Sequence, residues 1–106
     1  MRRHPGHESD LRHLARALAS ARDADEVHDA LEALLTPGER ETIALRWRLV
    51  RLLAQGLSQR AVAAALGVSL CKITRGAREL KDGPAGFRRM VRRTVRVAGE
   101  RARSRA

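Results

Sequence analysis

The chain has 106 residues, a formal net charge of +10 and two aromatic residues. This length fits one domain with a modest core, and the charge favours a polyanionic partner, nucleic acid before a membrane surface, because no cationic amphipathic anchor stands apart from the rest. The few aromatic residues argue against binding modes that stack bases on rings, and the absence of a signal peptide or a membrane-spanning run predicts a cytoplasmic protein.

The N-terminal part of the sequence predicts two helices after a disordered start. Residues 1–7 contain Pro and Gly and are expected to be disordered. From Glu8, apolar residues at helical spacing predict a helix that ends near Ser20 or Ala21. A second helix is predicted over about 23–34, because the acidic residues at its start favour a helix N-terminus. These acidic residues repel phosphates, so we do not expect this half to contact DNA.

The third predicted helix has the strongest start signal in the chain. Thr36 and Glu39 have the spacing of a capping box, in which each side chain bonds the other residue's backbone amide, and Pro37 suits the first helical position. The helix should run to Gln55 and stop at Gly56. It carries apolar residues on more than one face, more than a single small domain can bury, so we expect a partner subunit.

Residues 58–81 have the pattern of a helix-turn-helix. Ser58 and Ser69 are suited to cap the two helices, and Gly67 accepts the positive φ of the turn. Ala63 is small enough to let the two backbones meet. An ordinary buried helical hairpin has a similar pattern, but the polar and cationic residues of the second helix favour DNA binding. The apolar residues expected to hold the pair together are Val62, Leu66, Val68 and Ile73; the polar ones are Lys72, Thr74, Arg75 and Arg78.

Beyond Pro84, which is suited to open a helix, the sequence predicts a last helix and a basic tail. Apolar residues at helical spacing lie between Phe87 and Ala98, and residues 87–106 contain eight Arg and one Glu. We expect residues 99–106 to be disordered. Two roles for this basic segment are left open: a solubilising tail, or phosphate attraction that is independent of DNA sequence.

Metal sites, disulfides and catalytic sites have no support in the sequence. The single cysteine, Cys71, excludes a disulfide or a Cys-based zinc site within the chain, and the four histidines have no further ligand at suitable spacing. No motif combines a nucleophile, a base and an orienting residue, so we expect no catalytic residues and no enzyme. For Cys71 itself we favour packing or a base contact over a redox switch.

Two stretches together, LLTPGERETIALRWRLVRLLAQG and LSQRAVAAALGVSLCKITRGARELK, resemble the tryptophan-operon repressor family of bacteria over residues 31 to about 90. The pair LTPxERE and ITRG at this separation is far more specific than a helix-turn-helix alone. The resemblance implies an all-α, six-helix subunit over residues 8–98 and an intertwined homodimer. It also implies L-tryptophan as corepressor, with no other cofactor.

The resemblance further implies where tryptophan would bind. Arg46 and Arg75 would lie on the two faces of the indole, and Arg75 and Thr36 would bind the carboxylate. A guanidinium stacks on an indole with roughly 0.5 to 2 kcal/mol, and a carboxylate favours charged donors. From the residues alone, a solvated Arg46 and an Arg75 that contacts phosphate are the alternative. The remaining positions are the carbonyls that would hold the ammonium, from Ala33 and Leu35 of the other subunit, and the lining of the indole slot, from Val50 and Gly76.

For DNA, the resemblance implies an operator-facing surface on the two motif helices. Arg60 is the best candidate for a guanine contact, because a guanidinium pairs with O6 and N7. Cys71, Lys72 and Ala63 depart from the family pattern, and the link through Gly56 is one residue shorter, so the operator sequence and the pitch of the motif are expected to differ. The operator-facing residues are Gln59, Arg60, Leu70, Cys71, Lys72 and Thr74, and the expected phosphate contacts are Arg48, Arg78 and Lys81.

Taken with this resemblance, the sequence predicts an L-tryptophan-activated, sequence-specific repressor of tryptophan biosynthesis genes that binds operator DNA as a homodimer. Two alternatives use the same features differently. One is a helix-turn-helix regulator that answers another small molecule or none. The other is an architectural nucleic-acid-binding protein that relies on the Arg-rich tail.

Overall fold

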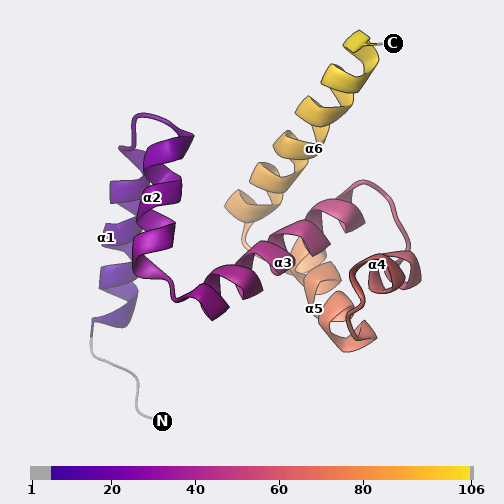
Figure 1. The fold of residues 1–106 in the computed structure, drawn as a ribbon, viewed down its shortest axis with the longest axis horizontal. Coiled ribbons are helices and arrows are strands. Elements are labelled where there is room, and N and C mark those ends of the chain that lie inside the picture. Colours follow the sequence, from indigo (N-terminus) through magenta and orange to yellow (C-terminus); the bar gives the residue numbers. More distant parts are fainter. Residues whose placement is uncertain (1–5, 106) are drawn as a thin grey trace. The chain divides into compact units, whose positions relative to one another are not determined.

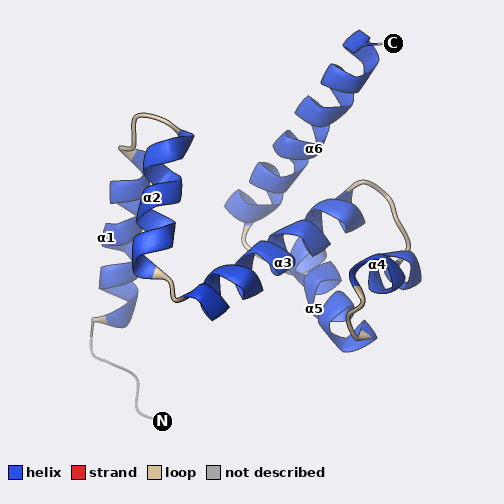
Figure 2. Cartoon of the chain, viewed as in Figure 1, coloured by secondary structure: helices blue, strands red, loops and turns tan. Residues whose placement is uncertain are grey.

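A computed structural model of the chain describes the backbone of residues 6–105 and the side chains up to Arg96. Within these residues Figures 1 and 2 show helices and connecting loops only, which confirms the all-α, six-helix prediction. The chain divides into two compact units, residues 1–41 and 42–106. The helices are α1 (His7–Ala19), α2 (Ala24–Leu34), α3 (Pro37–Ala54), α4 (Gln59–Leu66), α5 (Leu70–Asp82) and α6 (Ala85–Arg105).

The first unit consists of α1, α2 and the first turn of α3. α2 begins as its acidic residues predict, with Asp23 as N-cap accepting a hydrogen bond of 2.9 Å from the Glu26 amide. The apolar stripes of α1 and α2 are half-buried at Leu14, Leu18 and other positions, but neither helix contains a fully buried residue. This unit therefore has amphipathic helices without a dry core of its own.

The predicted capping box at the start of α3 is present in full. The Thr36 amide donates to Glu39 Oε1 at 2.9 Å, and the Glu39 amide donates to Thr36 Oγ1 at 3.2 Å. The hydrogen bonds from the Thr36 amide and then from its side chain stabilise the carboxylate and lower the pKa of Glu39 below its ordinary value. Two backbone amides that lack partners inside the helix are satisfied in this way.

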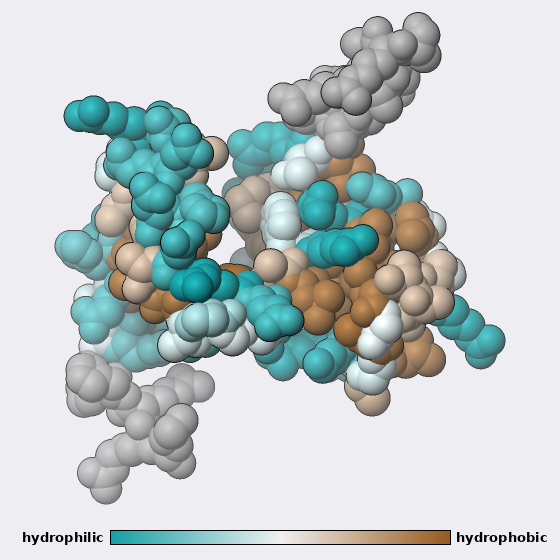
Figure 3. All heavy atoms as spheres, in the orientation of Figure 1, coloured by the Kyte–Doolittle hydropathy of each residue, from teal (hydrophilic) through white to brown (hydrophobic). Residues whose placement is uncertain are grey.

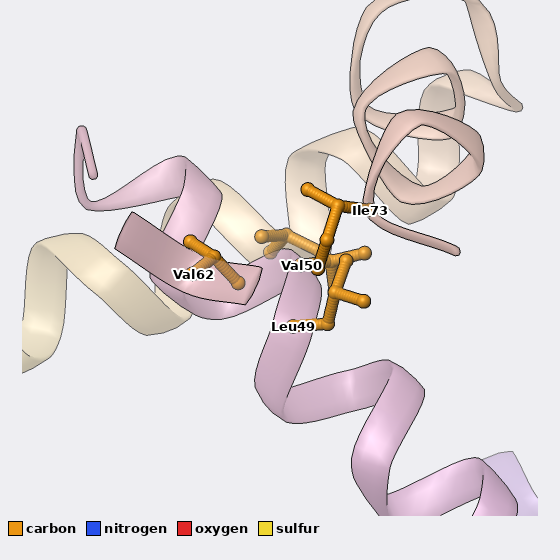
Figure 4. Close-up of a cluster of buried hydrophobic side chains, with 5 residues drawn as sticks. Leu49, Val50, Val62 and Ile73 are labelled. Atoms are coloured by element: carbon orange, nitrogen blue, oxygen red, sulfur yellow. The ribbon is translucent and has the colours of Figure 1, made fainter. Parts of the chain in front are cut away.

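The second unit folds around a small apolar core to which all four of its helices contribute. Leu49 and Val50 come from α3, Val62 from α4, Ile73 from α5 and Val91 from α6, and the last three are 0% exposed. Figure 4 shows this cluster of buried side chains, with Leu49, Val50, Val62 and Ile73 labelled. α5 packs against both α4 and α6. Val62 and Ile73 are thus core residues of the helix-turn-helix, as the sequence predicts.

One aromatic pair lies beside this core. The rings of Trp47 and Phe87 meet edge to face, with centroids 6.4 Å apart and planes at 67°. Both residues are half-buried against the core cluster. The pair ties the middle of α3 to the first turns of α6.

Several large apolar side chains remain exposed, as the brown residues on the face drawn in Figure 3 illustrate. Isolated exposed apolar residues are ordinary, but helices that carry an apolar stripe with no buried member lack a packing partner. The exposed residues are Leu11, Leu34, Ile43, Leu57, Leu70 and Met90.

The chain ends differ from the sequence prediction. We predicted disorder for residues 1–7. Residues 1–5 lie outside the described residues, and His7 is already the first residue of α1. At the other end α6 continues to Arg105, where a disordered tail was predicted from Gly99. The residues around Gly99 are mainly Arg, Ala and Val, and Arg and Ala favour helix strongly enough to carry it past one glycine.

Candidate nucleic-acid interface and ligand site

The helix-turn-helix forms by the local signals found in the sequence. Ser58 caps α4, its Oγ accepting a hydrogen bond of 3.1 Å from the Ala61 amide. Gly67 ends α4 in the left-handed region with φ of +64°, where a side chain would be strained. The Val68 amide then bonds the Ala63 carbonyl at 3.3 Å, which closes the turn over the small residue predicted at the crossing.

The expected cap at Ser69 is wrong in one respect. Ser69 occupies the N-cap position of α5 with extended backbone, but its hydroxyl makes no cap hydrogen bond within the described structure. The Ile73 amide donates to the Ser69 carbonyl at 3.4 Å, which is the ordinary first backbone hydrogen bond of α5 and not a side-chain cap. The first turn of α5 is exposed at this point, so water can satisfy its remaining amides.

A side-chain hydrogen bond links the two helices on the predicted operator-facing surface. Thr74 Oγ1 lies 3.2 Å from Gln59 Oε1 and 2.9 Å from the Leu70 carbonyl, and its single hydrogen serves these two acceptors. The first residue of α4 is thereby held against α5. The Gln59 amide nitrogen is left to point at another acceptor, as a base contact requires.

All the residues predicted to face DNA are exposed on the second unit. Leu70 is 49% exposed, so a large apolar side chain stands in the first turn of α5 next to the exposed, free thiol of Cys71. No residue of this set belongs to the buried core. The set comprises Gln59, Arg60, Leu70, Cys71, Lys72 and Thr74, with Arg48, Arg78 and Lys81 at the expected phosphate positions.

Two of the residues predicted to line the indole slot are brought together. Gly76 lies so close to α3 that an added Cβ would collide with Leu49 Cδ2 and would lie 3.6 Å from Val50 Cγ1. α5 can approach α3 here only because residue 76 has no side chain. Sequence reasoning did not identify Leu49, although its place beside Val50 on an apolar helix was a signal for burial.

The two arginines predicted for this slot extend from α3 and α5 into solvent. Arg46 precedes Val50 by four residues and therefore shares its helix face, and Arg75 is adjacent to Gly76. Both arginines are exposed. Two cationic side chains thus lie close in sequence to Val50 and Gly76, where the side chains of α3 meet the backbone of α5.

The other predicted ligand residues, Ala33, Leu35 and Thr36, belong to the first unit. Thr36 Oγ1 accepts from the Glu39 amide, and its hydroxyl also helps to stabilise the Glu39 carboxylate. The Leu35 carbonyl accepts a hydrogen bond of 3.0 Å from Arg40 Nη1, and the same nitrogen donates to the Glu32 carbonyl at 2.8 Å. Sequence reasoning missed Arg40, whose position in the first turn after α2 suits it to bind carbonyls at that helix end.

Within the described residues, no group of three or more His, Cys, Asp or Glu side chains could hold a metal ion. None of the helices in the described part of the chain is long and apolar enough to cross a membrane.

Comparison with known proteins agrees with this geometry. The family model described as Trp repressor protein matches residues 9–95. The chain is 41% identical over 73 residues to the Trp operon repressor homolog of Chlamydia caviae, covering 68% of this chain and 72% of that protein. For the homolog of Aliivibrio salmonicida the identity is 39% over 75 residues, covering 70% and 69%. For that of Vibrio vulnificus it is 50% over 56 residues, covering 51% and 55%.

The matched region contains the first helices, the capping box, the helix-turn-helix and most of α6. The match therefore extends well beyond the helix-turn-helix. It includes both stretches on which the sequence resemblance depends. The chain therefore belongs to the Trp repressor protein family, a family of DNA-binding transcription regulators.

Proposed function

We propose that this protein is an L-tryptophan-activated, sequence-specific repressor of tryptophan biosynthesis genes, acting as a homodimer. The observation that carries the proposal is the close approach of Gly76 to Leu49 and Val50. Because residue 76 has no side chain, Leu49 of α3 fills the space where one would lie, and Arg46 and Arg75 stand on the two helices nearby in sequence. A flat ring bound near this contact would touch both the core helix α3 and the DNA-binding helix α5.

The residue chemistry suits a free aromatic amino acid. Each guanidinium of Arg46 and Arg75 can stack on an indole face, and Arg75 can also pair with the carboxylate. The Thr36 hydroxyl, which serves the Glu39 carboxylate in this structure, would turn its hydrogen to the ligand carboxylate as a neutral donor. The ammonium requires acceptors, and the carbonyls at the end of α2, from Ala33 and Leu35 of the other subunit, supply them.

The packing of the first unit supports the proposed homodimer. Its helices have no fully buried residue, and Leu11 and Leu34 are 55% and 60% exposed. Apolar stripes on both helices are covered most simply by a second copy, and a closed two-fold dimer would present two helix-turn-helix motifs to successive major grooves.

Tryptophan would act by fixing the tilt of α4 and α5 relative to α3. An effector that tightens operator binding by about 10- to 100-fold contributes roughly 1.4 to 2.8 kcal/mol of coupling, and the operator must tighten tryptophan binding by the same factor. Operator binding would then exclude RNA polymerase from the promoter.

The ligand half of this proposal is tested by equilibrium dialysis with radiolabelled L-tryptophan. We expect the wild-type protein to bind it and Arg75→Ala to lose at least tenfold in affinity. Arg78→Ala is the matched control, because Arg78 is another exposed arginine of α5, placed at an expected phosphate contact. Equal binding by wild type and Arg75→Ala would overturn the site assignment. Binding of a different amino acid or indole, with none of L-tryptophan, would indicate the alternative regulator.

The DNA half is tested at Arg60. Arg60→Ala should flatten the preference between a selected operator-like duplex and a scrambled one by about tenfold or more, because a bidentate guanine contact discriminates by about 1 to 3 kcal/mol. Lys81→Ala should weaken both duplexes alike. An unchanged preference in Arg60→Ala would reject its role in base recognition.

A further inference from the structure

α6 carries a row of arginines on the side opposite its buried face. Arg89, Arg92, Arg93 and Arg96 are spaced three and four residues apart, so they share one face of the helix, and all four are exposed. Val91, which is 0% exposed, lies on the other side. These four side chains, here named the α6 arginine face, line an open hollow of about 430 Å³.

Packing and capping do not explain the α6 arginine face. Arg88, the neighbouring arginine, does have a structural role, since its Nε donates to the Gly83 carbonyl at 3.0 Å. Along the helix, Arg89, Arg92 and Arg93 have no Asp or Glu three or four residues away, and their neighbours at that spacing include one another. Like charges at this spacing destabilise a helix, so Arg89, Arg92 and Arg93 repel one another unless an anion binds them.

We propose that the α6 arginine face is a second DNA-binding surface, which binds the phosphate backbone of duplex DNA outside the sequence contacted by α4 and α5. From Arg89 to Arg96 the helix rises about 10 Å. Over that length one strand of a duplex presents about three phosphates, each of which a guanidinium can bind in bidentate fashion. All four side chains that define this face are arginines, and none is aromatic, so the face does not favour base stacking.

The acidic first unit of a second copy is the competing occupant. Residues 1–41 have nine acidic and six basic residues, so their net negative charge is weak and is spread over two helices. A DNA duplex, in contrast, carries one negative charge per about 1.7 Å of its axis. The denser anion is the better match for four arginines on two helical turns. Figure 1 shows α6 leading away from α4 and α5, so this face would contact a more distant part of the same duplex or a second duplex.

The test compares two variants of the full-length protein that lose the same charge. The variant Arg89→Gln/Arg92→Gln/Arg93→Gln removes three of the four charges of the α6 arginine face. The control Arg12→Gln/Arg16→Gln/Arg22→Gln removes the charges of three exposed arginines of the first unit. Gln keeps nearly the helix propensity of Arg. Binding of a fluorescent scrambled duplex is followed by anisotropy over a salt series, without tryptophan, so that the result does not depend on the corepressor.

We expect the slope of log K against log salt to fall by about 2 to 3 in the α6 variant, at about 0.9 per lost phosphate contact, and by less than about 1 in the control. Equal changes in both variants, or none, would overturn the proposal. So would an unchanged slope together with weaker self-association of the α6 variant in sedimentation, since that result assigns the face to a second copy.

Two further measurements complete the design. One sample of the duplex is labelled with a fluorescent donor and another with an acceptor. Energy transfer is expected if the wild-type protein bridges two duplexes, and no transfer is expected if the α6 arginine face and the α4–α5 surface bind the same duplex. If the glutamine variant fails to fold by circular dichroism, the arginine Nε–H signals of the wild-type protein are followed by NMR during titration with the scrambled duplex. Shifts at Arg89, Arg92 and Arg93 support the proposal, and shifts confined to residues of α4 and α5 contradict it.

Discussion

The two units of this chain differ in charge and in packing. Residues 1–41 contain nine acidic and six basic residues, and residues 42–106 contain three acidic and sixteen basic ones. α1 and α2 have no fully buried residue, whereas the described side chains of the second unit include five buried ones. The basic unit therefore combines its own core with the surfaces that suit a polyanion, and the acidic unit has apolar stripes that suit a partner subunit. Protein–protein and protein–DNA contacts are expected to separate along this division.

The largest effect should come from the core of the basic unit. Ile73 is 0% exposed, and Ile73→Ala should cost about 2 to 5 kcal/mol of unfolding free energy, because the deletion leaves a cavity among the four helices. Leu70→Ala, on the same helix but at a position 49% exposed, should cost about 0.5 kcal/mol or less. Urea unfolding followed by circular dichroism measures both, and similar losses would contradict the packing described.

The acidic unit should respond through association instead. Leu11→Ser/Leu34→Ser removes exposed apolar surface, so it should raise the dimer dissociation constant by about tenfold or more, or about 1.4 kcal/mol. Sedimentation equilibrium measures this constant. Leu70→Ser is the matched control in the basic unit and should leave it unchanged. If the control weakens the dimer as much as the double variant does, the proposed division of roles is wrong.

The sequence predicted what depends on local spacing. The capping box of Thr36 and Glu39, the left-handed Gly67 and the burial of Val62 and Ile73 all follow from signals within a few residues of each site. The contact of Gly76 with Leu49 could not be predicted, because it joins distant residues and depends on how closely α5 approaches α3.

The other differences between prediction and structure occur where a group has several possible hydrogen-bond partners or where neighbouring residues have opposite helix propensities. The hydroxyl of an exposed serine at an N-cap, as at Ser69, can bond water as readily as a backbone amide. The carbonyls that end α2 can be satisfied by several groups, and here Arg40 supplies the donor. Gly99 is a helix breaker within a segment rich in helix formers, and the surrounding residues decide the outcome. The tryptophan and DNA contacts, in contrast, stay predictions.

A smaller effect should distinguish the two serine caps of the helix-turn-helix. Ser58→Ala removes the acceptor of the Ala61 amide and should cost about 1 kcal/mol, the usual value of an N-cap. Ser69→Ala, where the hydroxyl makes no such bond within the described structure, should cost only a few tenths by comparison. Urea unfolding of the two variants measures both losses of unfolding free energy. A larger loss for Ser69→Ala than for Ser58→Ala would contradict the cap assignment.

The smallest effect is the acid sensitivity of the capping box. The pKa of Glu39 is lower in the folded chain than in the unfolded one, because the Thr36 amide and hydroxyl bind the charged carboxylate. This contribution is therefore present above the ordinary glutamate pKa of about 4.3 and is lost as pH falls through the lower folded value. Glu39→Gln should lose less stability than wild type between neutral pH and pH below about 4. Parallel pH profiles would show that the bond has no energetic role.

The most direct test of the central proposal is the effect of L-tryptophan on operator choice. A palindromic duplex is selected with the wild-type protein from a randomised pool, and its binding is compared with that of a scrambled duplex by fluorescence anisotropy. Salt is held constant, because electrostatic attraction alone binds any duplex. We expect L-tryptophan to tighten the selected duplex by about 10- to 100-fold and to leave the scrambled one unchanged. Equal affinity for both duplexes, with no response to L-tryptophan, would contradict the corepressor mechanism.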